Sequence, residues 1–395
     1  MEIFIPLLII AVMALVIWKS GEGFESASDY LGRNLSDGVK GATINAVGSS
    51  LPELLTTIFF LFILRNADGF AAGLGTTAGS AVFNAVVIPF IVVLAVYFKF
   101  NKTEIIISRK VILRDGIALI LVNVLLLVVI KSSFFGDSIT GDSAYSLTWK
   151  EGAVLMVFYI LYLAYLFIKM DKSKRDVVTG EKIDRSKIPS RTKIEIFHSI
   201  RTFNFEQAFV GHGTITQTRA WLLLIFSMSI MSAGCYGLAE ASIMLGDALG
   251  IPIFIVSVII AAAATSVPDT FLSYKDALKG NYDDSISNAF GSNVFDIGFA
   301  VGFPVLLFGL LFGDIHLDTN VLKDISELLV LLLFITIAVF LIFISSNKLS
   351  VWKVIFVFFF YILFISIILA KADKVEIIEP ISEFLFNFSN YFKIS

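Results

Sequence analysis

The sequence predicts an all-α, polytopic membrane protein with about ten transmembrane helices, arranged as two inverted five-helix repeats. Apolar residues make up 57% of the chain and charged residues only 16%, whereas a soluble protein carries about 25% charged residues. The apolar residues gather in long segments, and a helix needs about 20 of them to cross the hydrocarbon core. One polar signature occurs twice inside such segments, once in each half of the chain.

The apolar runs set the boundaries of ten predicted spans. They lie near residues 2–18, 41–64, 70–98, 113–131, 152–168, 219–245, 250–274, 284–313, 326–345 and 351–371. In a signal peptide the positive flank precedes the apolar run, but here Lys19 follows it. We therefore expect the first segment to be an uncleaved span that ends near residue 18, with Lys19 on the inside.

The charges of the loops predict the orientation. Basic loops alternate with acidic ones, and cytoplasmic loops carry the excess of lysine and arginine. The loop over residues 171–218 belongs to the basic set and is therefore expected in the cytoplasm, with both termini outside. The predicted divisions of the chain are a first repeat (1–170), the cytoplasmic loop (171–218), a second repeat (219–371) and a C-terminal tail (372–395). We expect an integral protein of the plasma (inner) membrane, with the tail as an amphipathic segment on the surface.

The repeated signature spans two successive helices in each half. The first copy covers residues 48–53 and continues over 79–84, and the second covers 264–269 and continues over 291–296. In the predicted orientation the span with the glutamate of the first copy runs outward, and the span with the aspartate of the second runs inward. The two copies are therefore inverted, which is how many secondary transporters build a binding site at the membrane midplane.

Each copy concentrates oxygen donors at membrane depth. Pro52 and Pro268 are expected to break their helices, and we expect the breaks to free backbone carbonyls at about Ala46, Ser49, Ala262 and Thr265. Carbonyl, hydroxyl, amide and carboxylate oxygens suit Ca²⁺ and alkali cations. The candidate cation ligands are Glu53, Asp269, Asp296, Asn84, Ser49, Ser50, Thr265, Ser266, Ser80, Ser292, Ala46 and Ala262. The three carboxylates among them match the charge of one Ca²⁺ plus a monovalent ion, or of up to three monovalent ions.

Other classes of site have little support. A single cysteine, Cys235, excludes a disulfide within the chain and a thiolate metal cluster. The three histidines fall in predicted loops, which excludes a serine–histidine hydrolase inside the membrane. We expect no catalytic residue, no resident cofactor and no nucleic-acid partner; the partners are transported ions and the lipid bilayer.

These motifs resemble the alpha-repeats of the calcium/cation antiporter superfamily, which includes the sodium/calcium exchangers. The amino-acid sequence is most similar to that of the potassium-dependent sodium/calcium exchangers in three segments, which are Gly41-Ala42-Thr43, residues 79–84 and residues 266–269. Thr76 departs from the pattern, because relatives commonly carry asparagine there. The resemblance implies a secondary-active antiporter that exchanges Ca²⁺ for Na⁺ by alternating access. In the potassium-dependent branch an aspartate matching Asp296 is linked to potassium dependence, so the resemblance also raises co-transport of K⁺.

Two alternatives stay open at the level of sequence. A Ca²⁺/H⁺ antiporter of the same fold would use the same carboxylates, because crowded and desolvated carboxylates bind protons more readily. An intramembrane aspartyl protease would use Asp269 and Asp296 as a catalytic pair. The protease has no need for the copy that contains Glu53, and the flanking residues do not resemble protease motifs, so it is the more distant alternative.

Overall fold

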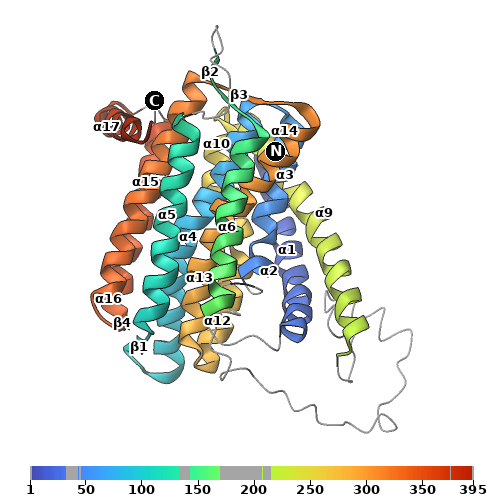
Figure 1. The fold of residues 1–395 in the computed structure, drawn as a ribbon, viewed down its shortest axis with the longest axis vertical. Coiled ribbons are helices and arrows are strands. Elements are labelled where there is room, and N and C mark those ends of the chain that lie inside the picture. The colour runs from blue at the N-terminus through green and yellow to red at the C-terminus, as the bar shows by residue number, and fades with distance from the viewer. Residues whose placement is uncertain are drawn as a thin grey trace.

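The computed structural model describes residues 2–32, 43, 46–132, 143–169, 207, 215–373 and 375–393, and these form one bundle of helices (Figure 1). Nine described helical segments are long and apolar enough to cross a membrane. A tenth segment is broken into two shorter helices over residues 46–64. The predicted polytopic α-helical fold is thus confirmed, with nine of the described helices long enough to span a membrane and the broken segment in the place of the second predicted span.

The elements of the first half follow the prediction closely. They are α1 (Phe4–Leu31), α2 (Ala46–Ser49), α3 (Leu51–Leu64), α4 (Ala67–Phe100), β1 (Glu104–Ile106), α5 (Arg109–Ser132), β2 (Ser143–Leu147) and α6 (Trp149–Lys169).

The second half repeats this order. It contains α9 (Gln217–Leu249), α10 (Ile253–Val256), the π-helical turn η4 (Ser257–Ala261), α11 (Ala262–Thr265), α12 (Val267–Lys279), α13 (Tyr282–Phe295), the π-helical turn η5 (Asp296–Ala300), α14 (Gly302–Phe312), β3 (Ile315–Asp318), α15 (Thr319–Ile344), β4 (Lys348–Ser350) and α16 (Val351–Ala372). The tail adds the short η6 (Glu376–Ile378), α17 (Glu379–Ser389) and η7 (Asn390–Phe392).

The first helix is longer than the sequence predicts. The expected end near residue 18 was wrong, because α1 continues to Leu31 and Lys19 lies inside it. The Lys19 ammonium donates to a Glu22 carboxylate oxygen 3.0 Å away, one helical turn further on. The Ser20 hydroxyl is buried and donates to the Val16 carbonyl at 2.7 Å. These local partners satisfy the polar groups, so the helix continues beyond its apolar run.

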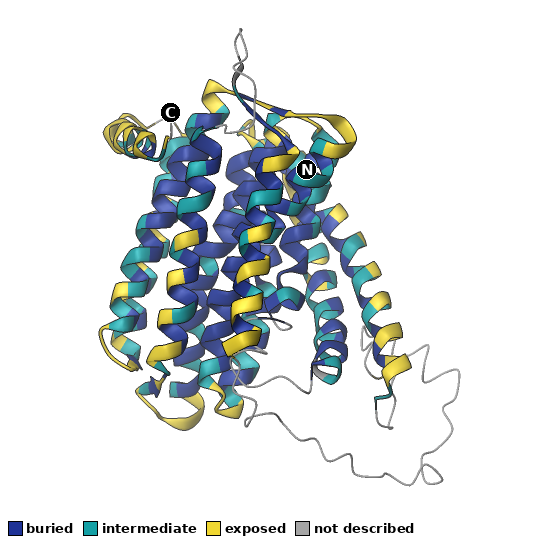
Figure 2. Ribbon diagram, viewed as in Figure 1, coloured by how far each residue is buried: buried dark blue, intermediate teal, exposed yellow. Residues whose placement is uncertain are grey.

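The centre of the bundle is formed by α4 and by the helix that continues from α13 into α14. Figure 2 shows the buried residues concentrated there, with exposed residues on the outer helices. Helix α4 of the first half packs against α12, α13, α15 and α16 of the second half. In the same way, α6 packs against α14 and α5 against α15. The two halves are therefore interlocked, and a large part of the core lies between them.

Two small antiparallel β-ribbons are related to each other by the inverted symmetry of the two halves. Strand β1, which precedes α5, pairs with β4, which precedes α16. Strand β2, which precedes α6, pairs with β3, which precedes α15. Exchanging the two halves converts one ribbon into the other, and the ribbons lie at opposite ends of the bundle (Figure 1). The all-α prediction did not include these strands, which are three to five residues long.

The predicted loop and tail are described to different extents. Most of the loop over 171–218 lies outside the described residues, so its predicted boundaries and side of the membrane stay predictions. In the tail, α17 packs against α15 through Phe384 and Phe388, whose rings contact Phe334. Its Ser382 hydroxyl donates to the Glu327 carboxylate at 2.7 Å. The tail thus forms an amphipathic helix that covers one end of α15.

Candidate cation site

Two helix breaks position the two copies of the signature. The first lies at Ser50, between α2 and α3, and the second at Ser266, between α11 and α12. In both cases the proline is the second residue of the following helix, and the carboxylate, Glu53 or Asp269, lies in its first turn. A proline fits there because the first helical N–H groups have no partner in the helix. The positive end of a helix dipole stabilises a carboxylate at the same place.

The expectation that the breaks free the carbonyls of Ala46 and Ala262 was wrong. The Ser50 N–H donates to the Ala46 carbonyl at 3.0 Å, and the Ser266 N–H donates to the Ala262 carbonyl, also at 3.0 Å. The Ser266 hydroxyl donates to the same Ala262 oxygen at 2.8 Å. A proline removes the hydrogen bond to the carbonyl four residues before it. In neither copy is that carbonyl the one of Ala46 or Ala262. A second lone pair remains on each oxygen, so the assignment of Ala46 and Ala262 as ligands stays a prediction.

Three fully buried carboxylates meet between the halves. Glu53, Asp269 and Asp296 each offer one oxygen, and these oxygens all lie within 4.8 Å of one another. Three points separated by at most 4.8 Å share a centre within about 2.8 Å of each, and Ca²⁺ binds carboxylate oxygens at about 2.3–2.6 Å. A small contraction around a cation would therefore give normal Ca²⁺ ligand distances.

The hydrogen bonds around the carboxylates follow the inverted symmetry. The Ser80 hydroxyl donates to Glu53 Oε1 at 3.0 Å, and the Ser292 hydroxyl donates to Asp269 Oδ1 at 2.9 Å. Each serine lies one helix after its acid, at separations of 27 and 23 residues. The alignment of the two copies that the sequence predicts is therefore reproduced in space.

Other contacts cross from one half to the other. The Asn84 amide donates to Asp269 Oδ2 at 2.7 Å, and the Ser50 hydroxyl lies 3.5 Å from the same oxygen. The Ser266 hydroxyl donates to the Ser80 hydroxyl at 2.8 Å. The site thus depends on the interface between the halves, and neither half contains it alone.

Two predicted ligands, Ser49 and Thr265, have hydrogen-bond partners outside the carboxylate cluster as well as within it. The Ser49 hydroxyl donates to the Asn288 side-chain oxygen at 3.4 Å, and the Thr265 hydroxyl donates to the Ala262 carbonyl of its own helix at 3.1 Å. Both hydroxyls also contact the cluster, because Ser49 hydrogen-bonds the Asp269 carboxylate and Thr265 hydrogen-bonds the Glu53 carboxylate.

Three buried oxygens of the cluster lack a hydrogen-bond partner among the described residues. They are Glu53 Oε2, Asp296 Oδ1 and Asn84 Oδ1. In the part of the chain that the structure describes, none of the recorded ion pairs involves Glu53, Asp269 or Asp296. Buried carboxylates are unfavourable unless they are paired or bind a metal. The donor set consists of oxygen only, and it fits a hard cation.

Sequence reasoning missed Asn288 and the π-helical turns. The Asn288 amide donates to the Ser273 hydroxyl at 3.1 Å and lies 3.4 Å from the Asp269 carbonyl. Asn288, Ser292 and Asp296 recur every four residues, so this spacing could have identified the whole face. Thr76 occupies the equivalent place in the first half, but its hydroxyl bonds back to the Ala72 carbonyl at 3.0 Å. A π-helical turn begins at Asp296, and such turns often occur at functional sites.

Two glycines allow α4 to approach the broken helix of the other half. A Cβ on Gly79 would lie 2.8 Å from the Ala262 Cβ, and one on Gly75 would lie 2.6 Å from the Ser257 hydroxyl oxygen. Only hydrogen fits at these positions. This close contact brings Ser80 and Asn84 within hydrogen-bonding distance of the second copy.

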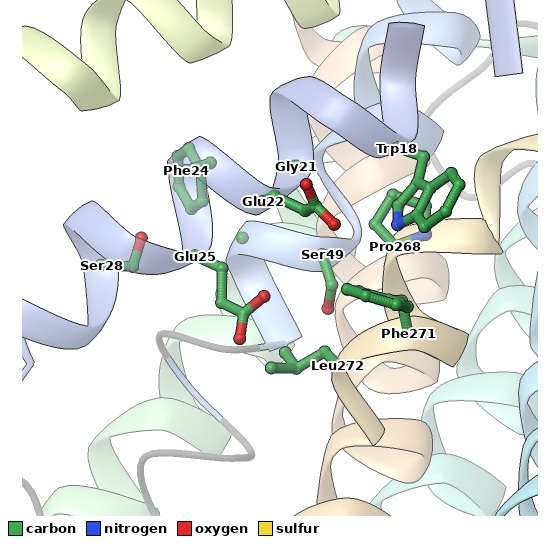
Figure 3. Close-up of a pocket in the computed structure, with 11 residues that line it drawn as sticks. Trp18, Gly21, Glu22, Phe24, Glu25, Ser28, Ser49, Pro268, Phe271 and Leu272 are labelled. Carbon is green, nitrogen blue, oxygen red and sulfur yellow. The ribbon is translucent and has the colours of Figure 1, made fainter. Parts of the chain in front are cut away.

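A narrow cavity of about 20 Å³ leads from the surface of α1 toward Ser49 (Figure 3). Such a volume holds about one water molecule. Glu22 and Glu25 of α1 line it, and Pro268 and Phe271 of α12 lie on the other side. The Glu25 carboxylate is 3.2 Å from the Lys275 ammonium. The Glu22 carboxylate is likewise paired with Lys19 at 3.0 Å, so the charges of both carboxylates are compensated where the cavity reaches Ser49 of the first helix break.

Comparison with known proteins relates this chain to the same family that its sequence motifs resemble. The family model described as "Sodium/calcium exchanger protein" matches residues 5–168 and 219–370. Human sodium/potassium/calcium exchanger 5 is 27% identical over 346 residues, which cover 71% of this chain and 64% of that protein. Mouse sodium/potassium/calcium exchanger 3 is 33% identical over 133 residues, 34% of this chain and 17% of that protein. The chain therefore spans less than two thirds of the length of these relatives.

Solved structures share the fold. The sodium-calcium exchanger NCX_Mj superposes with a TM-score of 0.56 at 20% identity, covering 92% of this chain and 98% of that one. The H⁺/Ca²⁺ exchanger CAX superposes with a TM-score of 0.61 at 14% identity, covering 99% and 86%. The resemblance to the calcium/cation antiporter superfamily, stated from the sequence motifs, is confirmed.

Proposed function

Because the chain belongs to the sodium/calcium exchanger protein family, we propose that it is a secondary-active antiporter that exchanges Ca²⁺ for Na⁺ across a membrane. The observation that carries this proposal is the buried cluster of Glu53, Asp269 and Asp296, with two carboxylate oxygens and the Asn84 amide oxygen unpartnered. One oxygen from each of the three carboxylates lies within 4.8 Å of the other two, so the three can share a cation, and the family match supports transport of that cation.

The proposed mechanism is competition for one set of oxygens. Ca²⁺ and Na⁺ are both hard cations that bind carboxylate, hydroxyl and carbonyl oxygens. Hence Glu53 and Asp269 act as the central ligands, and Ser50, Ser80 and Ser292 orient their carboxylates through the hydrogen bonds described above. One ion must leave before the other binds, and this couples the two fluxes.

Alternating access is supported by the inverted arrangement. Two interlocked halves related by inversion can exchange their conformations, and this exposes the shared site to the two sides in turn. The cavity between α1 and α12 is the route that we assign to one side, because it reaches Ser49 beside the first break. By the positive-inside rule, this is the cytoplasmic side of a plasma (inner) membrane.

Ca²⁺/H⁺ exchange is the second candidate. Clustered carboxylates also bind protons, and the H⁺/Ca²⁺ exchanger CAX has the same fold. Co-transport of K⁺ is a further candidate, because two curated relatives are named sodium/potassium/calcium exchangers. Catalysis by an aspartyl dyad has less support, because Asp269 is engaged by Asn84, Ser292 and Ser50, and Glu53 completes a cluster of three.

The test is uptake of ⁴⁵Ca²⁺ into proteoliposomes under imposed gradients. An outward Na⁺ gradient should drive uptake that stops when the gradient is abolished. Uptake driven equally by an outward proton gradient without Na⁺ would replace the proposal with Ca²⁺/H⁺ exchange. Absence of uptake under every gradient, from folded protein, would refute antiport of Ca²⁺.

A further inference from the structure

A wide groove between α5 and α6 lies away from the cation site. Its volume is about 810 Å³, and its described lining residues come only from these two helices. The helices contact each other sparsely, since α6 packs mainly against α14 and α5 against α15. Both belong to the set of candidate membrane spans. The groove therefore opens toward the hydrocarbon of the bilayer.

The walls of the groove are apolar and exposed. Leu121 of α5 is 53% exposed and Leu161 of α6 is 64% exposed. Figure 2 shows exposed residues along both helices. Large apolar side chains of a membrane span that face outward contact lipid chains. The groove thus provides an acyl-chain surface on each side.

Positive charge is confined to one end of the groove. Lys110 and Arg114 lie in the first two turns of α5, and Lys169 is the last residue of α6. The helices are antiparallel, so the three cations converge at the end of the bundle that carries β1 and β4 (Figure 1). No carboxylate is among the described lining residues.

The arginine is held rigidly. Its guanidinium donates to both oxygens of the buried Asp115, at 2.5 and 2.8 Å, and to the Ser287 hydroxyl at 2.9 Å. The Tyr162 hydroxyl and the Ser287 hydroxyl also donate to Asp115. Asp115 compensates the charge of Arg114. The uncompensated charge of the groove is therefore that of Lys110 and Lys169, for which no ion pair is recorded among the described residues.

We propose that this groove binds one anionic phospholipid, with its phosphate between Lys110 and Lys169 and its acyl chains along Leu121 and Leu161. An amphiphile with one charged end matches a groove whose cations lie at one end and whose walls are apolar. Basic pockets between transmembrane helices bind the headgroups of anionic lipids in this way.

Binding is measured by native mass spectrometry of the full chain in detergent. The probes are phosphatidylglycerol and phosphatidylcholine with identical acyl chains. The wild type should retain one phosphatidylglycerol in preference to phosphatidylcholine. Each lysine near an anionic headgroup contributes about fivefold in affinity, so Lys110→Gln/Lys169→Gln should weaken phosphatidylglycerol binding by about 30-fold.

Two matched variants make the test specific. Lys99→Gln/Lys102→Gln removes the same charge beside the same end of α5 but outside the groove, and should keep the preference. Leu121→Trp keeps the charges and fills the apolar wall, so it should reduce retention of both lipids. An equal loss in the Lys99/Lys102 variant would show that general surface charge attracts the lipid, and would overturn the site.

Three other outcomes would also overturn the proposal. The first is unchanged binding in the Lys110/Lys169 variant. The second is that inorganic phosphate competes at the headgroup end while Leu121→Trp has no effect, which would indicate an anion site without lipid. The third is a dimer in lipid-free detergent that Leu121→Trp dissociates, which would assign the groove to a second copy of the chain.

Discussion

Replacing Glu53 by glutamine tests the central part of the proposed mechanism. The change keeps the size of the side chain and removes one of three carboxylates whose oxygens lie within 4.8 Å of one another. Two unit charges 4 Å apart interact by about 4 kcal/mol at the effective dielectric constant of protein sites, so a divalent ion gains about 8 kcal/mol from one carboxylate. If the amide oxygen recovers half of this, about 4 kcal/mol is lost, which corresponds to about a thousandfold in Ca²⁺ affinity.

The same variant should change stability in the opposite direction. Without Ca²⁺ the ionised carboxylates repel one another, so Glu53→Gln should raise the melting temperature of the ion-free protein in detergent. With Ca²⁺ the wild type should be stabilised in proportion to the logarithm of the ion concentration, and the variant should respond only at about thousandfold higher Ca²⁺. The control is Glu151→Gln, which alters a buried carboxylate that accepts from Thr148 outside the site.

Thermal melting across a Ca²⁺ titration and ⁴⁵Ca²⁺ flux in proteoliposomes measure the two effects. Near-normal flux in Glu53→Gln, or a Ca²⁺-dependent rise in its melting temperature equal to that of the wild type, would refute the assignment of Glu53 as a ligand. A loss of flux in Glu151→Gln as large as in Glu53→Gln would show that any buried carboxylate is needed for folding. The loss in Glu53→Gln could then not be attributed to the charge that Glu53 contributes to Ca²⁺ binding.

Three further predictions concern the cluster and its surroundings. Asp296→Asn removes the third negative charge with little change in volume; if K⁺ is co-transported, wild-type flux should require K⁺ and the variant should not, and a wild type indifferent to K⁺ contradicts co-transport. Protons compete with cations for the same oxygens, so flux should fall as the pH is lowered and recover at higher Ca²⁺, and inhibition that saturating Ca²⁺ does not relieve would contradict competition at the site. Gly79→Ala places a methyl group 2.8 Å from the Ala262 Cβ and should destabilise the protein by about 1–3 kcal/mol, seen as a lower melting temperature with or without Ca²⁺; an unchanged melting temperature would mean that the helices separate freely.

The sequence alone determined the membrane class, the positions of the spans and the identity of the acidic cluster. These follow from local physics: a bilayer requires long apolar helices, a proline removes a hydrogen bond from the helix around it, and a carboxylate at membrane depth needs a partner. The doubled signature placed Glu53, Asp269 and Asp296 in one predicted site, and the structure brings them together.

Other features depend on hydrogen bonds along the helices that an apolar pattern does not reveal. The end of α1 is set by the partners of Lys19 and Ser20, and a hydropathy run does not contain them. The carbonyls of Ala46 and Ala262 are bonded because the helices break at the serines and the hydrogen bonds before each break are kept.

The hydrogen-bond partners of Asn288 and the groove between α5 and α6 became visible only in three dimensions. Asn288 contributes because α13 packs against α12 and directs its amide at Ser273. The groove exists because α6 packs on α14 of the other half and leaves its contact with α5 sparse. Local sequence decides which segments are helices and which side chains carry charge, whereas the packing of two interlocked halves decides which of those side chains meet.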